Sequence, residues 1–219
     1  MAKLPPHPDR PVPRPEAARG ELLELPPGTE VARIYFAAGP HPGTWRGFRS
    51  WGPLARARFD HHGPAPHESP DRSILYAGDT LTTVVAEVFQ STRVVDVDAG
   101  EPYLALLALV REVALLDLRS DWPTRAGASQ AIGSGPRWAC RNWSRAIWKD
   151  LANVEGLAWD SSMHHGGTCY AFYERSRDAF DRVPVANLPL ATRGLEIPLT
   201  NAADRLGYGL VLPRPFRVV

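Results

Sequence analysis

The chain has 219 residues, of which 44% are hydrophobic and 22% charged, so its length suits one globular domain with a sizeable core. A formal net charge of +1 gives no overall field that would favour nucleic acid or a membrane surface. Two cysteines are too few for a disulfide framework or a zinc cluster, which favours a reducing, cytoplasmic location. No apolar run is long enough to cross a bilayer, and the 22 prolines predict many loops.

The N-terminal segment is proline-rich and weakly basic. Such a composition cannot bury much apolar surface, so we expect residues 1–20 to be an extended or disordered arm. Residues 21–219 are expected to form a single domain, because the chain has no internal repeat and its length suits one domain.

The first strand with a clear pattern is predicted over residues 31–36, where side chains alternate between two faces. The alternation places Arg33 on the face opposite to Ile34. Residues 39–66 then show no clear period and carry aromatic residues and arginines among glycine, proline and histidine. Loops of this length inside a compact domain are usually functional or mobile. Their aromatic rings are candidates for capping a pocket, and arginines such as Arg58 for binding an anion.

Residues 73–90 predict a short strand, a turn and an amphipathic helix, because leucine and valine recur at the i, i+3, i+4, i+7 spacing of one buried stripe. Asp79 suits the N-cap of this helix. Glu87 lies at the edge of the stripe, and Tyr76 ends the strand. An aromatic ring and a partly desolvated carboxylate at such a corner are typical of a small-molecule site. The alternative is that Glu87 is a solvated helix-edge acid and Tyr76 a core tyrosine.

The second half of the chain alternates further strands with helices, which predicts an α+β fold with a mixed, mostly antiparallel sheet and flanking helices. The first two of its strands would either form a hairpin or lead from a strand into a turn. Prolines make the last strand an edge strand. The predicted strands are 103–110, 113–118, 156–161, 168–173 and 183–185, and the predicted helices are 122–132, 138–151 and 201–206.

Several common site motifs are absent from the sequence. It contains neither a G-x-G-x-x-G turn after a strand nor a G-x-x-x-x-G-K-[ST] loop, so no Rossmann or P-loop nucleotide site is indicated. The pairs His61-His62 and His164-His165 lie in predicted loops, and no H-E-x-x-H is present. We therefore expect ordinary loop histidines and no metal site.

Residues from separate parts of the chain would together suit a dinucleotide. Arg33 and Arg58 can pair with a pyrophosphate, and Tyr76 can stack on a heterocycle. Glu87, held by a helix, can hydrogen-bond ribose hydroxyls and stabilise an oxocarbenium ion. Ser161 can orient the ligand. Each also has a plain structural interpretation, such as a salt-bridged strand residue for Arg33 or a strand-end turn former for Ser161.

In the order and spacing of these motifs the chain resembles the RES-domain family, whose name comes from an Arg, a Glu and a Ser. The resemblance covers roughly residues 31–174, most of the globular part. No single motif is highly specific, whereas their order and spacing together are fairly specific. The matching elements are R-I-Y at 33–35, R-F-D at 58–60, the Tyr and Ala-Glu of 76–87, G-L-x-W-x-S at 156–161, and the strand at 170–174.

The resemblance implies a fold like the catalytic core of ADP-ribosylating toxins. It also implies the toxin half of a type II toxin–antitoxin pair, which depletes NAD+ by cleaving the nicotinamide–ribose bond as a glycohydrolase or phosphorylase. NAD+ is then the substrate, and no metal is expected. The implied partner is a small antitoxin with an Xre-like helix-turn-helix that occludes the active site, in a complex that allows a toxin homodimer. Direct binding of nucleic acid or a membrane is not expected.

Residue by residue, the resemblance implies that Arg33, Glu87 and Ser161 are catalytic. Ser162 is the alternative serine, although strand alternation would turn it to the other face. Two alternative functions stay open, an ADP-ribosyltransferase that modifies a cellular protein and a non-catalytic module that binds an Xre-like partner. The implied NAD+-binding residues are Arg33, Arg58, Tyr76, Glu87 and Ser161.

Overall fold

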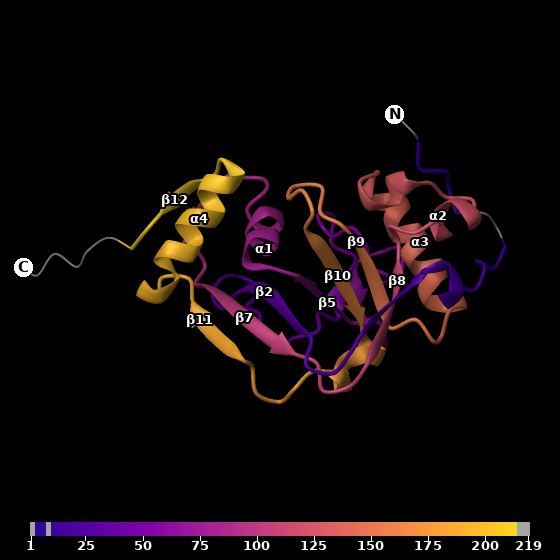
Figure 1. Cartoon of the computed structure of the whole chain (residues 1–219), viewed down its shortest axis with the longest axis horizontal. Helices are drawn as coiled ribbons and strands as arrows, with labels where there is room; N and C mark the ends of the chain where they lie inside the picture. The colour runs from indigo at the N-terminus through magenta and orange to yellow at the C-terminus, as the bar shows by residue number, and fades with distance from the viewer. Residues whose placement is uncertain (1–2, 8–9, 214–219) are drawn as a thin grey trace, which may run out of the picture.

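The computed structural model describes residues 3–7 and 10–213. In this part of the chain the main element is an eight-stranded sheet with the order β1-β8-β9-β10-β5-β2-β7-β11 (Figure 1). Neighbouring strands in this sheet are antiparallel, except for the parallel pair of β8 and β9. Two small sheets pair β3 with β4 and β6 with β12. The strands are β1 (Leu22–Leu25), β2 (Glu30–Phe36), β3 (Trp51–Gly52), β4 (His67–Glu68), β5 (Ile74–Gly78), β6 (Val94–Asp96), β7 (Pro102–Ala108), β8 (Val113–Asp117), β9 (Gly156–Asp160), β10 (Thr168–Tyr173), β11 (Ala186–Pro189) and β12 (Gly209–Val211).

Helix α1 lies over the central strands β10, β5 and β2 of this sheet, and α4 packs beside it. Figure 1 shows α4 on one side of α1, and α2 and α3 together on the other side of the molecule. None of the helices in the described residues is long and apolar enough to span a bilayer. The α-helices are α1 (Leu81–Val88), α2 (Trp122–Arg125), α3 (Arg137–Asp150) and α4 (Glu196–Leu206), and the 3-10 turns are η1 (Ala17–Arg19), η2 (Pro70–Arg72), η3 (Gln130–Gly133), η4 (Glu174–Ala179) and η5 (Arg193–Leu195).

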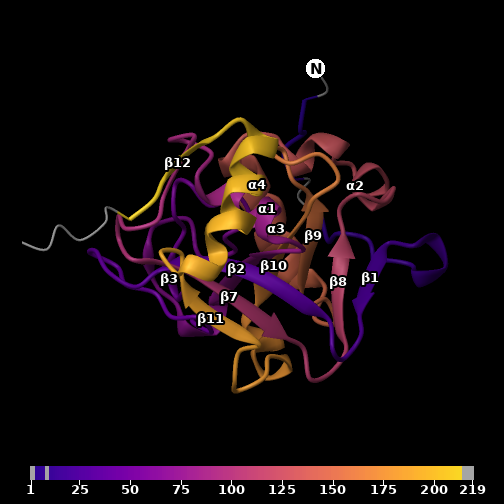
Figure 2. The ribbon, with the colours of Figure 1, turned by 60° about the vertical axis from the view of Figure 1, so that its left-hand side comes forward.

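The predicted fold class, a mixed and mostly antiparallel sheet with flanking helices, is confirmed. The hairpin considered for β7 and β8 is not formed. Strand β7 pairs with β2 and β11, whereas β8 pairs with β1 and β9 in the other half of the sheet. Figure 2 shows β1 beside β8 at one edge and β11 beside β7 at the other. The partners of both strands are distant in sequence, so the local pattern could not identify them.

Helices α1 and α3 cover the same face of the sheet. Cys169 and Tyr173 lie on one face of β10, because side chains alternate along a strand. The Tyr173 hydroxyl lies 3.1 Å from Ser144 Oγ on α3. Cys169 pairs with Gly78, where an added Cβ would stand 3.0 Å from Val84 of α1. The absence of a side chain at this glycine lets α1 lie directly on the sheet.

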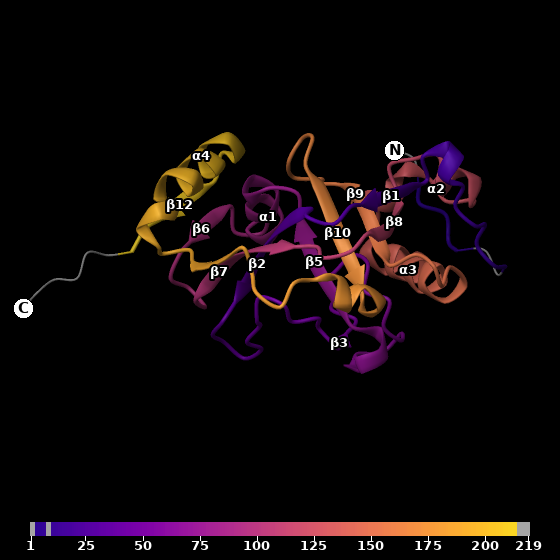
Figure 3. The same cartoon turned by 60° about the horizontal axis from the view of Figure 1, so that its bottom comes forward.

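Strands β2 and β5 separate after a single pair, Ala32 with Gly78. Further along β5, Ile74 pairs instead with Arg49, which comes from the long loop after β2. The loop therefore occupies the wedge between the two strands, and the Arg33 guanidinium donates across it to the Gly47 carbonyl at 2.9 Å. In Figure 3 the loop segment around β3 lies on the side of the sheet away from α4.

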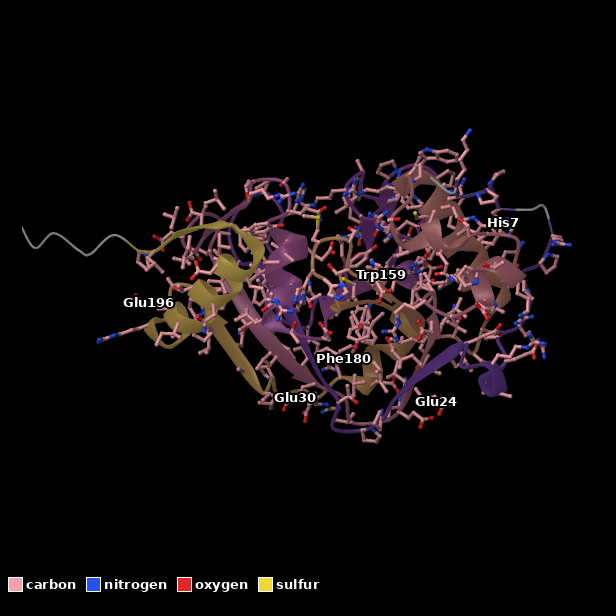
Figure 4. All side chains as sticks on the ribbon, turned by 45° about the horizontal axis from the view of Figure 1, so that its top comes forward. His7, Glu24, Glu30, Trp159, Phe180 and Glu196 are labelled. Atoms are coloured by element: carbon pink, nitrogen blue, oxygen red, sulfur yellow. The ribbon has the colours of Figure 1, made fainter. Side chains whose placement is uncertain are left out.

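The described part of the N-terminal arm includes the 3-10 turn η1 and packs on the end of the molecule that holds α2 and α3. The Trp143 indole donates to the Pro5 carbonyl at 2.9 Å, and the Trp122 indole donates to the Pro13 carbonyl at 2.9 Å. Figure 4 places His7 at this end of the molecule. The arm contributes backbone acceptors to buried tryptophans, a role that its proline-rich composition did not indicate.

Candidate active site

Helix α1 begins with a network of hydroxyls and one carboxylate. Its N-cap is Thr80, whose Oγ1 accepts from the Thr83 amide at 3.2 Å, so the prediction of Asp79 as N-cap was wrong. Asp79 instead accepts from Thr83 Oγ1 at 2.6 Å and from the Thr168 amide at 3.0 Å. The Asp79 carboxylate therefore joins the first turn of α1 to strand β10. It makes this tertiary contact in place of the N-cap hydrogen bond predicted for it.

Glu87, one turn after Thr83, is held by a serine hydroxyl. Ser161 Oγ donates to Glu87 Oε1 at 2.6 Å and accepts from the amides of Met163 at 3.1 Å and His164 at 3.0 Å. A hydroxyl has one proton and two lone pairs. Because the two amides occupy the lone pairs, the serine proton is directed at the Glu87 carboxylate.

Beside this pair lies an apolar patch of the sheet surface, the apolar floor, which consists of Trp159, Cys169 and Gly78. These residues are register partners on three adjacent strands, and Trp159 and Cys169 are buried. Burial raises the pKa of the Cys169 thiol well above its usual range, and the charge of Glu87 acts in the same direction. The thiol stays protonated and serves as an uncharged neighbour of the carboxylate. Figure 4 shows Trp159 near the middle of the molecule.

Tyr76 stands next to this floor with its hydroxyl already bonded. The hydroxyl donates to Asp60 Oδ1 at 2.9 Å and accepts from the Phe59 amide at 3.0 Å. Its ring meets Trp159 edge to face, with 6.3 Å between the ring centroids. Burial raises the pKa of Tyr76 well above its usual range, so the phenol is neutral. Tyr76 can therefore offer a ligand its ring but not a free hydroxyl.

Asp60 connects Tyr76 to the long loop. Its side chain is fully buried and accepts from Arg49 Nη2 at 2.6 Å and from the Leu54 amide at 2.7 Å. A buried carboxylate requires such partners, because an unpaired one would be costly. The sequence motif R-F-D contained this residue, but nothing in it indicated that the acid would hold the tyrosine.

Arg33 is a desolvated cation in the wedge between β2 and β5. Burial lowers the pKa of Arg33 to about 10, and the nearby charge of Arg49 acts in the same direction, so the guanidinium stays protonated at neutral pH. Its hydrogen bond goes to the neutral carbonyl of Gly47, and among the described residues no carboxylate pairs with it. A partly buried cation that no described carboxylate neutralises suits an anionic ligand.

Arg58, the second arginine expected at the site, points to another part of the molecule. Its Nη1 donates to the Gly135 carbonyl at 2.6 Å and lies 3.8 Å from Cys140 Sγ, at the start of α3. In the described part of the chain no hydrogen bond or ion pair joins Arg58 to Arg33 or Glu87. The sequence could not show that a carbonyl near α3 would take this guanidinium.

The predicted site residues are thus not all in contact with one another. Ser161 and Glu87 share a hydrogen bond, and the ring of Tyr76 meets that of Trp159, which lies two residues before Ser161 in the sequence. Arg33 occupies the wedge without contacting them. Ser162, the alternative serine, is exposed.

The described residues contain no group of three or more His, Cys, Asp or Glu side chains that could hold a metal ion. A hollow of about 290 Å³ lies elsewhere, at the start of α4. It is lined by residues that include Arg193, Glu196 and Leu212. The hollow is therefore separate from the Glu87–Ser161 pair.

Comparison with known proteins identifies the family. The RES-domain family model matches residues 30–198. No curated protein matches the chain. A chain of the solved M. tuberculosis MbcT–MbcA toxin–antitoxin complex is similar, with 14% sequence identity and a TM-score of 0.48, over 80% of this chain and 92% of that one. The family match covers most of the globular part and confirms the resemblance found in the motifs: the chain belongs to the RES-domain family.

Proposed function

We propose that the protein is the toxin of a toxin–antitoxin pair and that it depletes NAD+ by cleaving the nicotinamide–ribose bond. Membership of the RES-domain family supports the reaction class. One observation carries the proposal: a serine whose lone pairs are both occupied directs its proton at Glu87, beside an aromatic ring and an apolar floor. This geometry suits a fixed negative charge that faces a developing cation.

In the proposed reaction the bond between ribose C1′ and the nicotinamide nitrogen breaks, and its electron pair leaves with nicotinamide. The oxocarbenium-like ribosyl group that remains is stabilised by the Glu87 carboxylate. A water or phosphate oxygen then bonds to C1′. Water gives ADP-ribose and releases one proton, whereas phosphate gives the 1-phosphate. Glu87 can accept a hydrogen bond from the incoming water and so align it.

The remaining predicted residues would bind the substrate. Arg33, which pairs with no carboxylate in the described part of the chain, would pair with the pyrophosphate, and the Tyr76 ring would pack against nicotinamide or its ribose. Arg58 would reach the pyrophosphate only after releasing the Gly135 carbonyl. We therefore expect Arg58 to contribute less to NAD+ affinity than Arg33.

The proposed partner is a small antitoxin with an Xre-like helix-turn-helix, whose C-terminal part would cover the Glu87–Ser161 pair. Family membership supports this proposal. Co-expression with the product of the neighbouring gene tests it. Relief of growth arrest together with a stable complex that no longer consumes NAD+ is the expected result.

Product analysis with the purified, partner-free protein tests the reaction. We expect loss of NAD+ with release of nicotinamide in equal amount, and of ADP-ribose or, with phosphate present, its 1-phosphate. Label transferred to protein with little free ADP-ribose would instead identify an ADP-ribosyltransferase. Unchanged NAD+ would contradict the proposal and favour an interaction module.

A further inference from the structure

The loop between β9 and β10 is attached to α1 at two points one helical turn apart. At the first point Ser161 Oγ donates to Glu87 Oε1 at 2.6 Å. At the second, His164 Nδ1 lies 2.9 Å from Thr83 Oγ1. Thr83 and Glu87 are four residues apart and lie on the same side of the helix. The loop that carries Ser161 therefore has a second anchor, which lies outside the family's three name-giving residues.

The hydrogen bonds at the second anchor have a defined direction. Thr83 Oγ1 donates its proton to Asp79 Oδ1 at 2.6 Å, so toward His164 it is an acceptor. His164 Nδ1 must then carry the proton that the threonine accepts. Burial lowers the pKa of His164, and the Arg205 guanidinium of α4 acts in the same direction, so the ring is neutral. The chain of donors runs from the histidine through the threonine to Asp79.

The packing around the anchor is close. A Cβ added at Gly167 would stand 2.5 Å from both His164 Nδ1 and Thr83 Oγ1, so no other residue fits there without displacing them. The histidine is only 8% exposed, and its Nε2 is buried without a hydrogen-bond partner. Burying this nitrogen is unfavourable, so the position of the ring is maintained by the hydrogen bond at Nδ1 and the packing around it.

The backbone amide of this same histidine is one of the two that donate to Ser161 Oγ, at 3.0 Å. We propose that His164, anchored by Thr83 and Asp79, is a positioning residue that fixes this amide and through it the Ser161 hydroxyl and the Glu87 carboxylate. The inference rests on the proposed function of Glu87. It adds that residues outside the site set the orientation of the catalytic charge.

A matched pair of substitutions at Thr83 tests the anchor. Thr83→Val keeps the shape of the side chain and removes the hydroxyl, whereas Thr83→Ser keeps the hydroxyl. We expect Thr83→Val to lower kcat for nicotinamide release about tenfold or more with KM within about twofold, because the misplaced charge acts in the transition state. Thr83→Ser is expected to retain most of the wild-type kcat. Equal kcat values for the two variants would overturn the inference.

A second pair addresses the histidine itself. An asparagine amide can donate from nearly the same place as imidazole Nδ1, whereas leucine cannot. His164→Asn is therefore expected to keep most of the kcat that His164→Leu loses. Thermal unfolding of both variants controls for general destabilisation. A kcat loss shared by both variants at equal melting temperature would contradict the proposed role.

An additional measurement does not depend on activity. Amide hydrogen exchange, followed by NMR, reports whether the Met163 and His164 amides stay bonded to Ser161. We expect faster exchange in Thr83→Val and wild-type exchange in Thr83→Ser. If the wild-type protein leaves NAD+ intact, the proposed function fails, but this exchange pattern still shows whether Thr83 holds the two amides in place. If NAD+ is consumed and exchange is unchanged in Thr83→Val, the anchor alone is refuted.

Discussion

We propose that Ser161 acts in the site through its position rather than as a nucleophile. Two amides hold its lone pairs, and its proton faces Glu87. Removing the hydroxyl leaves both amides without this acceptor and the carboxylate without its donor. Such losses involving a charged group amount to about 1.5–3 kcal/mol. We therefore expect Ser161→Ala to lower kcat/KM for NAD+ about 10- to 100-fold.

Ser162→Ala is the matched control for that substitution, since this neighbouring serine is exposed. Its kinetics should equal those of the wild-type protein. Steady-state release of nicotinamide measures both variants under the same conditions. Similar losses in the two would show that the hydroxyl of Ser161 has no special role.

In the proposed site, the hydroxyl of Tyr76 stabilises the fold and its ring contacts the ligand. Tyr76→Phe removes one donor to the buried Asp60 and the acceptor of the Phe59 amide, but keeps the ring. We expect unfolding in urea to show a loss of about 1–3 kcal/mol in stability. The KM for NAD+ should change less than twofold or so, because the ring remains in place. A large rise in KM with unchanged stability would instead assign the hydroxyl to the ligand.

At the residue scale the sequence assigned Glu87 and Ser161 to one candidate site, but it did not predict a hydrogen bond between them. The structure shows that Ser161 Oγ donates to Glu87 Oε1. The partners of Arg58 and His164 come from segments far apart in the chain. A hydrogen bond between distant residues leaves no periodic signal in the sequence, so these contacts could not be predicted.

At the element scale, α3 holds the long loop by a row of arginines one turn apart. Their guanidinium groups donate to loop carbonyls, which replaces the regular pairing that the loop largely lacks. The row therefore fixes the loop that contains Asp60. The contacts are Arg137 to Arg56, Arg141 to Leu54, Ala55 and Ala57, and Arg145 to His62.

Arg141→Ala removes the central contacts of this row. We expect faster hydrogen exchange at residues 54–57 and easier proteolysis of the loop, because three carbonyls lose their donor. Lys149→Ala, an exposed position at the end of the same helix, is the control and should leave the loop protected. Equal exchange in the two variants would mean that the loop is held by other contacts.

The bounds of elements with a strong hydrophobic period were predicted to within about one residue. The prediction of a strand at 168–173 coincides with β10 (Thr168–Tyr173), and that of a helix at 138–151 with α3 (Arg137–Asp150). The predicted helix at 122–132 is instead the short α2 followed by η3. Its pattern was only moderately helical, and Gly127 between the two elements has a positive φ of 89°, which does not continue a helix.

At the scale of the whole molecule, two adjacent buried histidines make stability depend on pH. His61 and His62 are both fully buried. Burial lowers the pKa of His61, against the opposing effect of Glu174, and lowers the pKa of His62 to about 4. A lowered pKa in the folded state means that the unfolded chain binds the proton more readily below pH 6.5. Stability is therefore complete above pH 6.5 and falls as the pH drops toward 4.

Urea unfolding between pH 7.5 and 4.5 measures this dependence. We expect the free energy of unfolding to fall below pH 6.5 by up to about 1.4 kcal/mol per pH unit for each histidine. A His62→Gln variant removes one of the two titrating groups and should show a shallower slope. An identical slope in this variant would exclude His62 as a source of the effect.

The arrangement of the whole sheet was beyond the sequence pattern. The composition of β2, β5 and β7 predicted strands, but the separation of β2 from β5 depends on the loop residue Arg49 pairing with Ile74. This insertion places Arg33 in the wedge, where it has no carboxylate partner among the described residues. Strand pairing is set by contacts between residues distant in sequence, and the pattern of a single sequence does not reveal them.

In the proposed reaction the Glu87 carboxylate stabilises the transition state of NAD+ cleavage. Glu87→Gln keeps the shape and removes the charge, and Glu24→Gln, an exposed acid on β1, is its control. Turnover and the dissociation constant for NAD+ are measured on both. We expect Glu87→Gln to lower turnover by about 100-fold or more while NAD+ still binds within a few-fold of wild type, because the charge acts in the transition state. Undiminished NAD+ turnover in Glu87→Gln would contradict this proposal.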